Sequence, residues 1–250
     1  MDQLLQSGYL CHPQQLYTLR RVTVAEGRAK GTGIIEVATA GGLQVDILPD
    51  AGLDIGQVRY RGVNVAFISK NGYDSPAAIA PYETEFLNTF PGGMLYTCGL
   101  RSTGGAHRDG DEWHPLHGRY HSLQAEQVCT EVVDGAILIR GTLRETALFG
   151  HCLELKRTIR IPVTGSSISV CDELTNLTHR DEEYALRTTA TSAIPSCRRR
   201  PVWHCRRTGK PHPEPPLRQR AWAGRPPSMR PSPEKKSGSS SMRIWSGPLP

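Results

Sequence analysis

Three absences narrow the classes of protein to which this sequence can belong. No stretch approaches 18 consecutive apolar residues, so no transmembrane helix is expected. The N-terminus, Met1 to Gln6, has neither the basic region nor the apolar core of a secretory signal peptide. The seven cysteines are widely spaced, odd in number and without a Cys-x-x-Cys pair, which argues against a disulfide framework and a structural zinc site. We therefore expect a protein of the reducing cytoplasm.

Excess positive charge is absent from most of the chain. Residues 1–187 carry 17 Lys/Arg and 22 Asp/Glu, a net charge of −5, whereas residues 188–250 carry 13 and 2, a net charge of +11. A nucleic acid or an anionic membrane would thus have to bind the tail. Its arginine clusters, Arg198–Arg200 and Arg206–Arg207, have no interleaved aromatic pattern and no recognisable fold motif. We expect neither a nucleic-acid nor a membrane partner.

The pattern of residues 31–187 is that of an antiparallel β-sandwich. Apolar and polar residues alternate over 43–48 and again over 153–161, which is the period of a strand with one apolar and one wet face. Asp134-Gly135 suits the positive φ angles of a type I′ turn between strands at 128–133 and 136–143. Helical periodicity is almost missing, so the fold class is all-β. Residues 1–30 are weakly patterned, and residues 16–24 are expected to form either an edge strand or a short leader.

The tail, residues 188–250, contains neither Tyr nor Phe and holds 12 of the 19 prolines. A disordered Pro/Arg/Ser-rich tail is one interpretation. The genetic code offers another, because reading each codon one base earlier allows Thr188 to Ser196 to encode Tyr-His-Cys-Asn-Phe-Gly-Tyr-Pro-Phe. The amino-acid sequence read in the shifted frame has the composition of a folded β-protein. We favour a frameshift near residue 187 and expect a sandwich that is incomplete at its C-terminus, with residues 188–250 out of frame.

Residues 70–125 are rich in Gly, Pro, His and Arg and have little strand pattern. Loops of that length in a compact domain are usually either functional or disordered, and the histidines and arginines of this one favour function. Arginine and histidine donate hydrogen bonds to hydroxyl oxygens, and histidine also exchanges protons near neutral pH. The predicted ligand-contacting residues are Arg101, His117, Arg119 and His121. An arginine at a strand end also commonly pairs with a carboxylate, so Arg101 has a second, structural interpretation.

A metal site is not expected in this segment. His117 and His121 lie four residues apart and could share a metal on a helix, but Pro115 and Gly118 argue against a helix there. No carboxylate completes a ligand set.

Four motifs follow one another along the chain. They are Leu48-Pro49-Asp50-Ala51-Gly52-Leu53-Asp54-Ile55-Gly56, the segment from Gly92-Gly93-Met94 to Thr97-Cys98-Gly99-Leu100, Leu116-His117-Gly118-Arg119 with Gln124-Ala125-Glu126, and the frame-shifted Tyr-His-Cys-Asn-Phe-Gly-Tyr-Pro. This ordered series resembles the poorly characterised aldose-1-epimerase-like branch of the galactose-mutarotase superfamily. The resemblance implies a galactose-mutarotase-like supersandwich whose concave face binds a monosaccharide. It also implies interconversion of sugar anomers by a general base and a general acid, without a cofactor.

The resemblance assigns sugar contact to His117 and hydroxyl binding to Arg101. It places the acid histidine in the shifted Tyr-His-Cys-Asn motif and the base glutamate later still, so both are absent from the chain as written. Ala51 also stands where a basic residue is expected, whereas Asp54 is expected to cap a turn. We therefore expect a carbohydrate-binding, aldose-1-epimerase-like protein with impaired activity. A non-catalytic carbohydrate-binding module and, less favoured, a nucleic-acid-associated protein acting through its tail are the alternatives.

Overall fold

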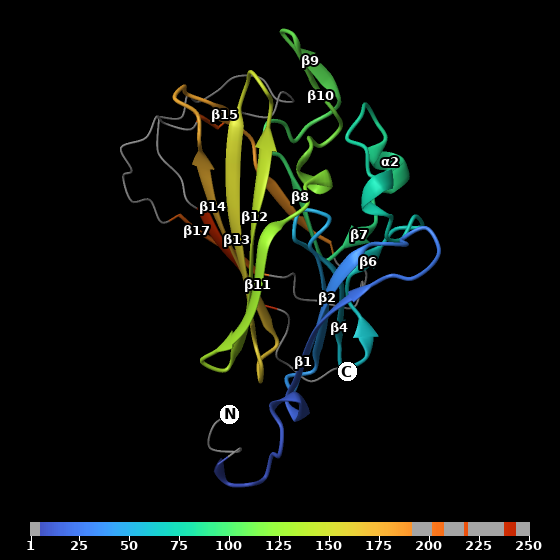
Figure 1. The fold of residues 1–250 in the computed structure, drawn as a ribbon, viewed down its shortest axis with the longest axis vertical. Helices are drawn as coiled ribbons and strands as arrows, with labels where there is room; N and C mark the ends of the chain where they lie inside the picture. The colour runs from blue at the N-terminus through green and yellow to red at the C-terminus, as the bar shows by residue number, and fades with distance from the viewer. Residues whose placement is uncertain (1–5, 192–201, 208–217, 220–237, 244–250) are drawn as a thin grey trace.

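The computed structural model describes residues 6–191, 202–207, 218–219 and 238–243 (Figure 1). Its strands are β1 (Tyr17–Thr23), β2 (Gly33–Thr39), β3 (Leu43–Leu48), β4 (Asp54–Tyr60), β5 (Val63–Asn64), β6 (Phe67–Ile68), β7 (Gly92–Gly93), β8 (Leu95–Cys98), β9 (His107–Asp109), β10 (Glu112–His114), β11 (Glu126–Val133), β12 (Ala136–Thr146), β13 (Cys152–Pro162), β14 (Ser167–Asn176), β15 (Glu183–Tyr184), β16 (Arg187–Ala190), β17 (Val202–Arg207), β18 (Arg218–Gln219) and β19 (Gly238–Arg243). Its helical turns are η1 (Pro13–Gln15), η2 (Pro76–Ala78), α2 (Phe86–Thr89) and η3 (Tyr120–Ser122). No helix in this part of the chain is long and apolar enough to cross a membrane. The expected all-β class is confirmed.

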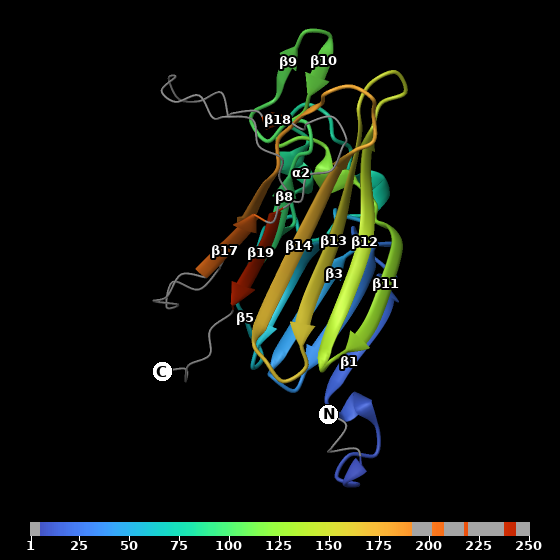
Figure 2. The same cartoon turned by 90° about the vertical axis from the view of Figure 1, so that its left-hand side faces the viewer.

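Two antiparallel sheets face each other and form the sandwich (Figures 1 and 2). The first sheet has the order β1-β2-β3-β4-β8-β16, with β5 paired to β4, and the second has the order β11-β12-β13-β14-β19-β17. The segment for which a leader or an edge strand was expected contains β1, which is the edge of the first sheet. The second sheet is built mainly from consecutive hairpins, so its register follows from the turns between neighbouring strands.

Local turn chemistry explains the tightest hairpins. Asp134 and Gly135 have φ angles of 49° and 67°, and Val133 pairs directly with Ala136 across them. Both central residues of a type I′ turn need positive φ, and this twist matches that of the flanking strands. The expected hairpin at this dipeptide is confirmed.

The core lies between the two sheets and takes apolar side chains from both. Strand β13 alternates as the sequence predicted, with one exception on each of its faces. Arg157 stands on the apolar face between Leu155 and Ile159 and is fully buried. Glu154, expected on the wet face, is also buried and pairs with Arg144. Period-2 patterning thus located the strand but not the two charged residues that the fold encloses.

Strand β8 belongs to the first sheet, so the loop expected over residues 70–125 contains one strand of the sandwich. The other residues between β5 and β11 leave the sandwich and cover one side and one end of the first sheet. Figure 1 shows α2, β6 and β7 beside that sheet and the hairpin β9–β10 at its upper end. This excursion, for which a functional loop was expected, positions the site described below. Most of residues 188–250, including most of the segment with the shifted motif, lies outside the described residues, so the interpretations of the tail remain predictions.

Candidate functional site

Strand β8 presents alternate side chains to opposite faces of the first sheet. Leu95 and Thr97 are buried toward the other sheet, whereas Tyr96 and Cys98 pack against Phe86 and its neighbours on the outer face. The Tyr96 ring stands edge-on to the Phe86 ring, with centroids 5.5 Å apart. Burial raises the pKa of the Cys98 thiol to about 12, so this cysteine is not a nucleophile at neutral pH.

Two of the predicted residues, His117 and His121, converge on this outer face. The Phe86 ring lies 4.6 Å from the His117 ring and 5.6 Å from the His121 ring, both edge-on, and Tyr96 stacks on His121 at 6.0 Å. The Nδ1 atom of His117 lies 3.2 Å from the carbonyl oxygen of Thr103. We call His117, His121, Tyr96 and Phe86 the histidine site.

His121 is held as a neutral imidazole. Burial, and then the positive charge that His117 can carry, lower the pKa of His121 to about 4. Neither ring nitrogen has a hydrogen-bond partner within the described part of the protein. At neutral pH the ring therefore offers a ligand one N–H donor and one lone pair.

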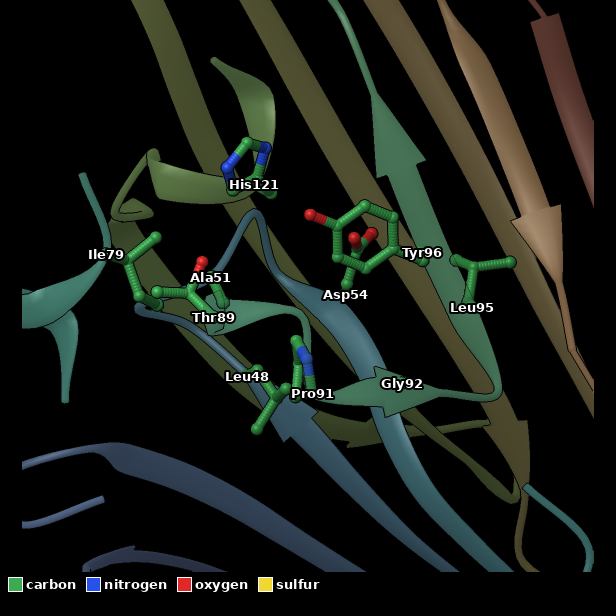
Figure 3. Close-up of a pocket in the computed structure, with 10 residues that line it drawn as sticks. All are labelled: Leu48, Ala51, Asp54, Ile79, Thr89, Pro91, Gly92, Leu95, Tyr96 and His121. Carbon is green, nitrogen blue, oxygen red and sulfur yellow. The ribbon is translucent and has the colours of Figure 1, made fainter. Parts of the chain in front are cut away.

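A shallow pocket opens beside the histidine site (Figure 3). Figure 3 shows the imidazole of His121 and the phenol of Tyr96 toward one end of it, with Leu48 and Pro91 toward the other. Most of its wall is apolar or backbone; the lining residues are Leu48, Ala51, Asp54, Ile79, Thr89, Pro91, Gly92, Leu95, Tyr96 and His121.

The other two predicted residues, Arg101 and Arg119, contact carboxylates at the end of the sandwich. Arg101 donates to Glu112 at 2.9 Å and to Glu182 at 3.0 Å, which agrees with its structural interpretation. The Nη1 atom of Arg119 lies 3.9 Å from Oε1 of Glu145, and its Nη2 donates to the carbonyl of Trp113 at 2.7 Å. We call Arg101, Glu112, Arg119, Glu145 and His151 the arginine–carboxylate cluster.

His151 lies between the two carboxylates of this cluster. Its Nδ1 lies 3.9 Å from Oε1 of Glu112, and its Nε2 lies 3.8 Å from Oε1 of Glu145. Burial acts to raise the pKa of Glu112, but the hydrogen bond and charge of Arg101 outweigh it, so that pKa is lowered. Burial raises the pKa of Glu145 and, with the charge of Arg101, lowers the pKa of His151 to about 4. The cluster therefore keeps its histidine neutral while its arginines carry the positive charge.

The structure thus divides the four predicted residues between two neighbouring groups. The backbone of Gly99 joins them, because its carbonyl accepts from the amides of Arg119 and Tyr120 and its amide donates to the carbonyl of His117. The expectation that Arg101, His117 and Arg119 grip one sugar ring remains a prediction. In this structure the two arginines face Glu112, Glu145 and Glu182, whereas His117 faces Phe86.

Asp54 does not cap a turn as the sequence suggested. Its carboxylate accepts from the amide and the hydroxyl of Thr97, both at 2.7 Å, and from the buried guanidinium of Arg157. Arg157 also makes two bonds of 2.8 Å to Asp172, and its remaining donors reach Gly52 and Thr97. All five of its N–H groups are therefore satisfied, and the network ties the two sheets together.

Sequence reasoning missed this network, although a signal was present. Arg157 shares the phase of Leu155 and Ile159, and a charged residue in the apolar phase of a strand needs a buried partner. Tyr120 packs its ring 5.3 Å from the Arg157 guanidinium and donates its hydroxyl to Gly52 at 2.9 Å. The network therefore anchors η3, the turn on which His121 lies.

Strand β16 lies beside the histidine site and gives position 189 a defined place. Thr189 pairs directly with Tyr96, so their side chains leave the same face of the first sheet. Position 189 is the one at which the shifted frame permits histidine in the Tyr-His-Cys-Asn motif.

The sequence profile of the family described as Domain of unknown function (DUF4432) matches residues 29–188. The chain belongs to this family. No curated protein matches the sequence. Among solved structures, a candidate aldose 1-epimerase from Klebsiella pneumoniae is 24% identical, with a TM-score of 0.60, over 66% of this chain and 44% of that one. This likeness shows that the family member described here has the fold of that protein.

Two further structures are more distant. A galactose mutarotase-like protein from Clostridium acetobutylicum is 16% identical, with a TM-score of 0.46, over 66% of this chain and 51% of that one. A galactose 1-epimerase from Lactobacillus acidophilus is 13% identical, with a TM-score of 0.44, over 70% of this chain and 52% of that one. The chain spans about half the length of each of these neighbours or less.

Proposed function

We propose that this DUF4432 member is a sugar-binding, aldose-1-epimerase-like protein whose monosaccharide ligand binds at the histidine site. The observation that carries the proposal is the pairing of Tyr96 with Thr189. This pairing would put the histidine of the restored Tyr-His-Cys-Asn motif on the outer face of the first sheet, where His117 and His121 already lie. A third imidazole there would add a further group that can donate a proton to the ligand.

The chemistry follows from what each group can do. The pocket wall beside Tyr96 would pack against the apolar face of a pyranose, and His117 and the neutral His121 would hydrogen-bond its hydroxyl groups. In the restored chain a histidine at position 189 would donate a proton to the ring oxygen. The base glutamate that the resemblance places later in the shifted frame would take the proton of the anomeric hydroxyl, and the bond between the anomeric carbon and the ring oxygen would break to open the ring. Arg101 and Arg119 would hold the loops around the ligand through Glu112 and Glu145. No step needs a cofactor.

The test is anomer exchange followed by NMR on D-galactose and D-glucose. Three chains are compared: the chain as written, the frame-restored chain, and the frame-restored chain that keeps threonine at position 189. We expect acceleration by the restored chain alone. If it does not accelerate exchange of either sugar, the enzymatic part of the proposal is wrong.

The second candidate is a non-catalytic carbohydrate-binding module. It is favoured for the chain as written, because position 189 is threonine and the pKa of His121 is about 4, so this ring is not protonated at neutral pH. Calorimetric binding of galactose or glucose without anomer exchange would support it. Loss of that binding in His117→Ala would place the ligand at the histidine site, whereas unchanged binding would place it elsewhere.

A further inference from the structure

We propose that Glu145 is a positioning residue for the histidine site. Its buried carboxylate fixes the backbone of Gly99 and Leu100, and residues 117–121 are hydrogen-bonded to that backbone. The effect on sugar binding rests on the proposed function, whereas the effect on the position of the histidines does not.

The first link is the hydrogen bond from the backbone of Leu100 to Glu145. Glu145 lies on β12 and is 3% exposed, and its Oε2 accepts the Leu100 amide at 2.6 Å. Such charge-assisted bonds are short and strong. The Leu100 carbonyl accepts the Ala185 amide at 2.7 Å, so this residue is fixed on both sides. The carboxylate thus ties the second sheet to the residue that follows Gly99.

The second link runs from Gly99 to the histidines. The Gly99 carbonyl accepts the amides of Arg119 at 2.9 Å and Tyr120 at 2.8 Å, and its amide donates to the His117 carbonyl at 3.3 Å. The side chain of Arg119 turns back toward Glu145, with its Nη1 3.9 Å from Oε1. The Leu100 amide and the Arg119 side chain therefore both face the carboxylate of Glu145.

The third link is the backbone conformation that this connection supports. His117 has a φ of 65°, in the left-handed region that residues other than glycine rarely adopt. Surrounding contacts must hold such a residue in place. Gly118 beside it has a φ of 77°, and a Cβ there would lie 2.2 Å from the Ser102 carbonyl oxygen. A segment built in this way needs a fixed anchor, and the Gly99–Leu100 backbone, held by Glu145, provides one.

The experiment compares Glu145→Met, which keeps the length of the side chain without an acceptor, with Glu145→Gln, which keeps an acceptor oxygen. Amide exchange at Leu100 and the imidazole resonances of His117 and His121 are followed by NMR in the ligand-free full chain. In Glu145→Met we expect exchange at Leu100 to accelerate about tenfold or more and the imidazole resonances to move. Glu145→Gln should restore both. Glu131→Met on the neighbouring strand β11, where the carboxylate is partly exposed and pairs with Arg140, should change neither.

Titration with D-galactose forms the second arm and separates the two proposals. Affinity should fall about tenfold in Glu145→Met and recover in Glu145→Gln. If the unsubstituted chain binds no sugar but its imidazole resonances depend on Glu145, the proposed function fails and the positioning role stands. A folded Glu145→Met chain with unmoved imidazole resonances overturns the positioning role.

If Glu145→Met does not fold, a pH titration of the unsubstituted chain tests the proposal instead. The chemical shift of the Leu100 amide must then change as the Glu145 carboxyl is protonated, and that protonation is measured directly by carboxyl ¹³C NMR. Arg101, Arg119, Glu112 and His151 also face this carboxyl, so its own titration must be observed. If the Leu100 amide shift does not change as the Glu145 carboxyl titrates, the proposal is wrong.

Discussion

Replacing Arg157 with leucine removes the guanidinium that joins Asp54 on β4 to Asp172 on β14. Asp172 would lose two hydrogen bonds of 2.8 Å, and Asp54 would keep only its two bonds to Thr97. Both carboxylates are buried. Breaking a buried ion pair by removing one partner costs about 3–5 kcal/mol, because the remaining charge stays desolvated. We expect the free energy of unfolding at pH 7.5 to fall by about that amount.

The loss of unfolding free energy in Arg157→Leu should depend on pH, and the pKa of Asp54 determines whether it grows or shrinks as the pH rises. Burial raises its pKa to about 6, and Arg157 acts against that rise. A carboxyl whose pKa is raised in the folded state stabilises the fold at pH values below its unfolded pKa, and that contribution disappears as the pH rises through the folded pKa. Without Arg157 the pKa of Asp54 rises further, so the loss extends to higher pH. The variant should therefore be closest to the unsubstituted chain near pH 5 and furthest from it near pH 8.

Urea unfolding followed by circular dichroism at pH 5, 6.5 and 8 measures both effects. Arg140→Leu on β12 is the matched control, since Arg140 is partly exposed and pairs with Glu131, and we expect it to change stability by about 0.5 kcal/mol or less. A loss in Arg157→Leu below about 1 kcal/mol at pH 8, or one equal at pH 5 and pH 8, would refute the reasoning from buried charge.

Three further predictions concern single features of the chain. Burial depresses the pKa of His121 to about 4, so its contribution to stability is present above its ordinary pKa of 6.5 and is lost as the pH falls toward 4. The urea unfolding midpoint of His121→Phe should therefore fall less between pH 7 and pH 4.5 than that of the unsubstituted chain. An equal fall in the two chains would contradict this prediction. Gly52 has a φ of 68°, and a Cβ there would lie 2.6 Å from the Tyr120 ring, so Gly52→Ala should destabilise the fold by about 2 kcal/mol or more, as measured by urea unfolding against Gly62→Ala, where φ is also positive but space is open. The chain as written should be less soluble than the frame-restored chain, because a sandwich without its closing strands exposes strand edges; equal amounts of both after ultracentrifugation would be evidence against an incomplete sandwich.

Local signals predicted most of the architecture. The alternation over residues 153–161 and the turn at Asp134-Gly135 depend only on neighbouring residues, so the strands and the hairpin could be inferred without the fold. The same alternation did not predict that Glu154 is buried, because its burial depends on packing by segments elsewhere in the chain.

The candidate site could be predicted only as a set of residue types. The sequence identified Arg101, His117, Arg119 and His121 as polar groups in a long loop, but not their partners. Arg101 pairs with Glu182, 81 residues away in the chain, and local pattern has no means of choosing that partner over another carboxylate.

The amino-acid sequence by itself determined the β-class, the strand periods and the loop that carries the histidines, because turn geometry and apolar alternation act over a few residues. Only the tertiary structure decided that Arg157 bridges the sheets, that the arginines face carboxylates while His117 and His121 meet Phe86 and Tyr96, and that Glu145 lies beneath the connection between these groups. These arrangements depend on contacts between residues far apart in the chain, where desolvation makes each buried charge seek whichever partner the fold brings near.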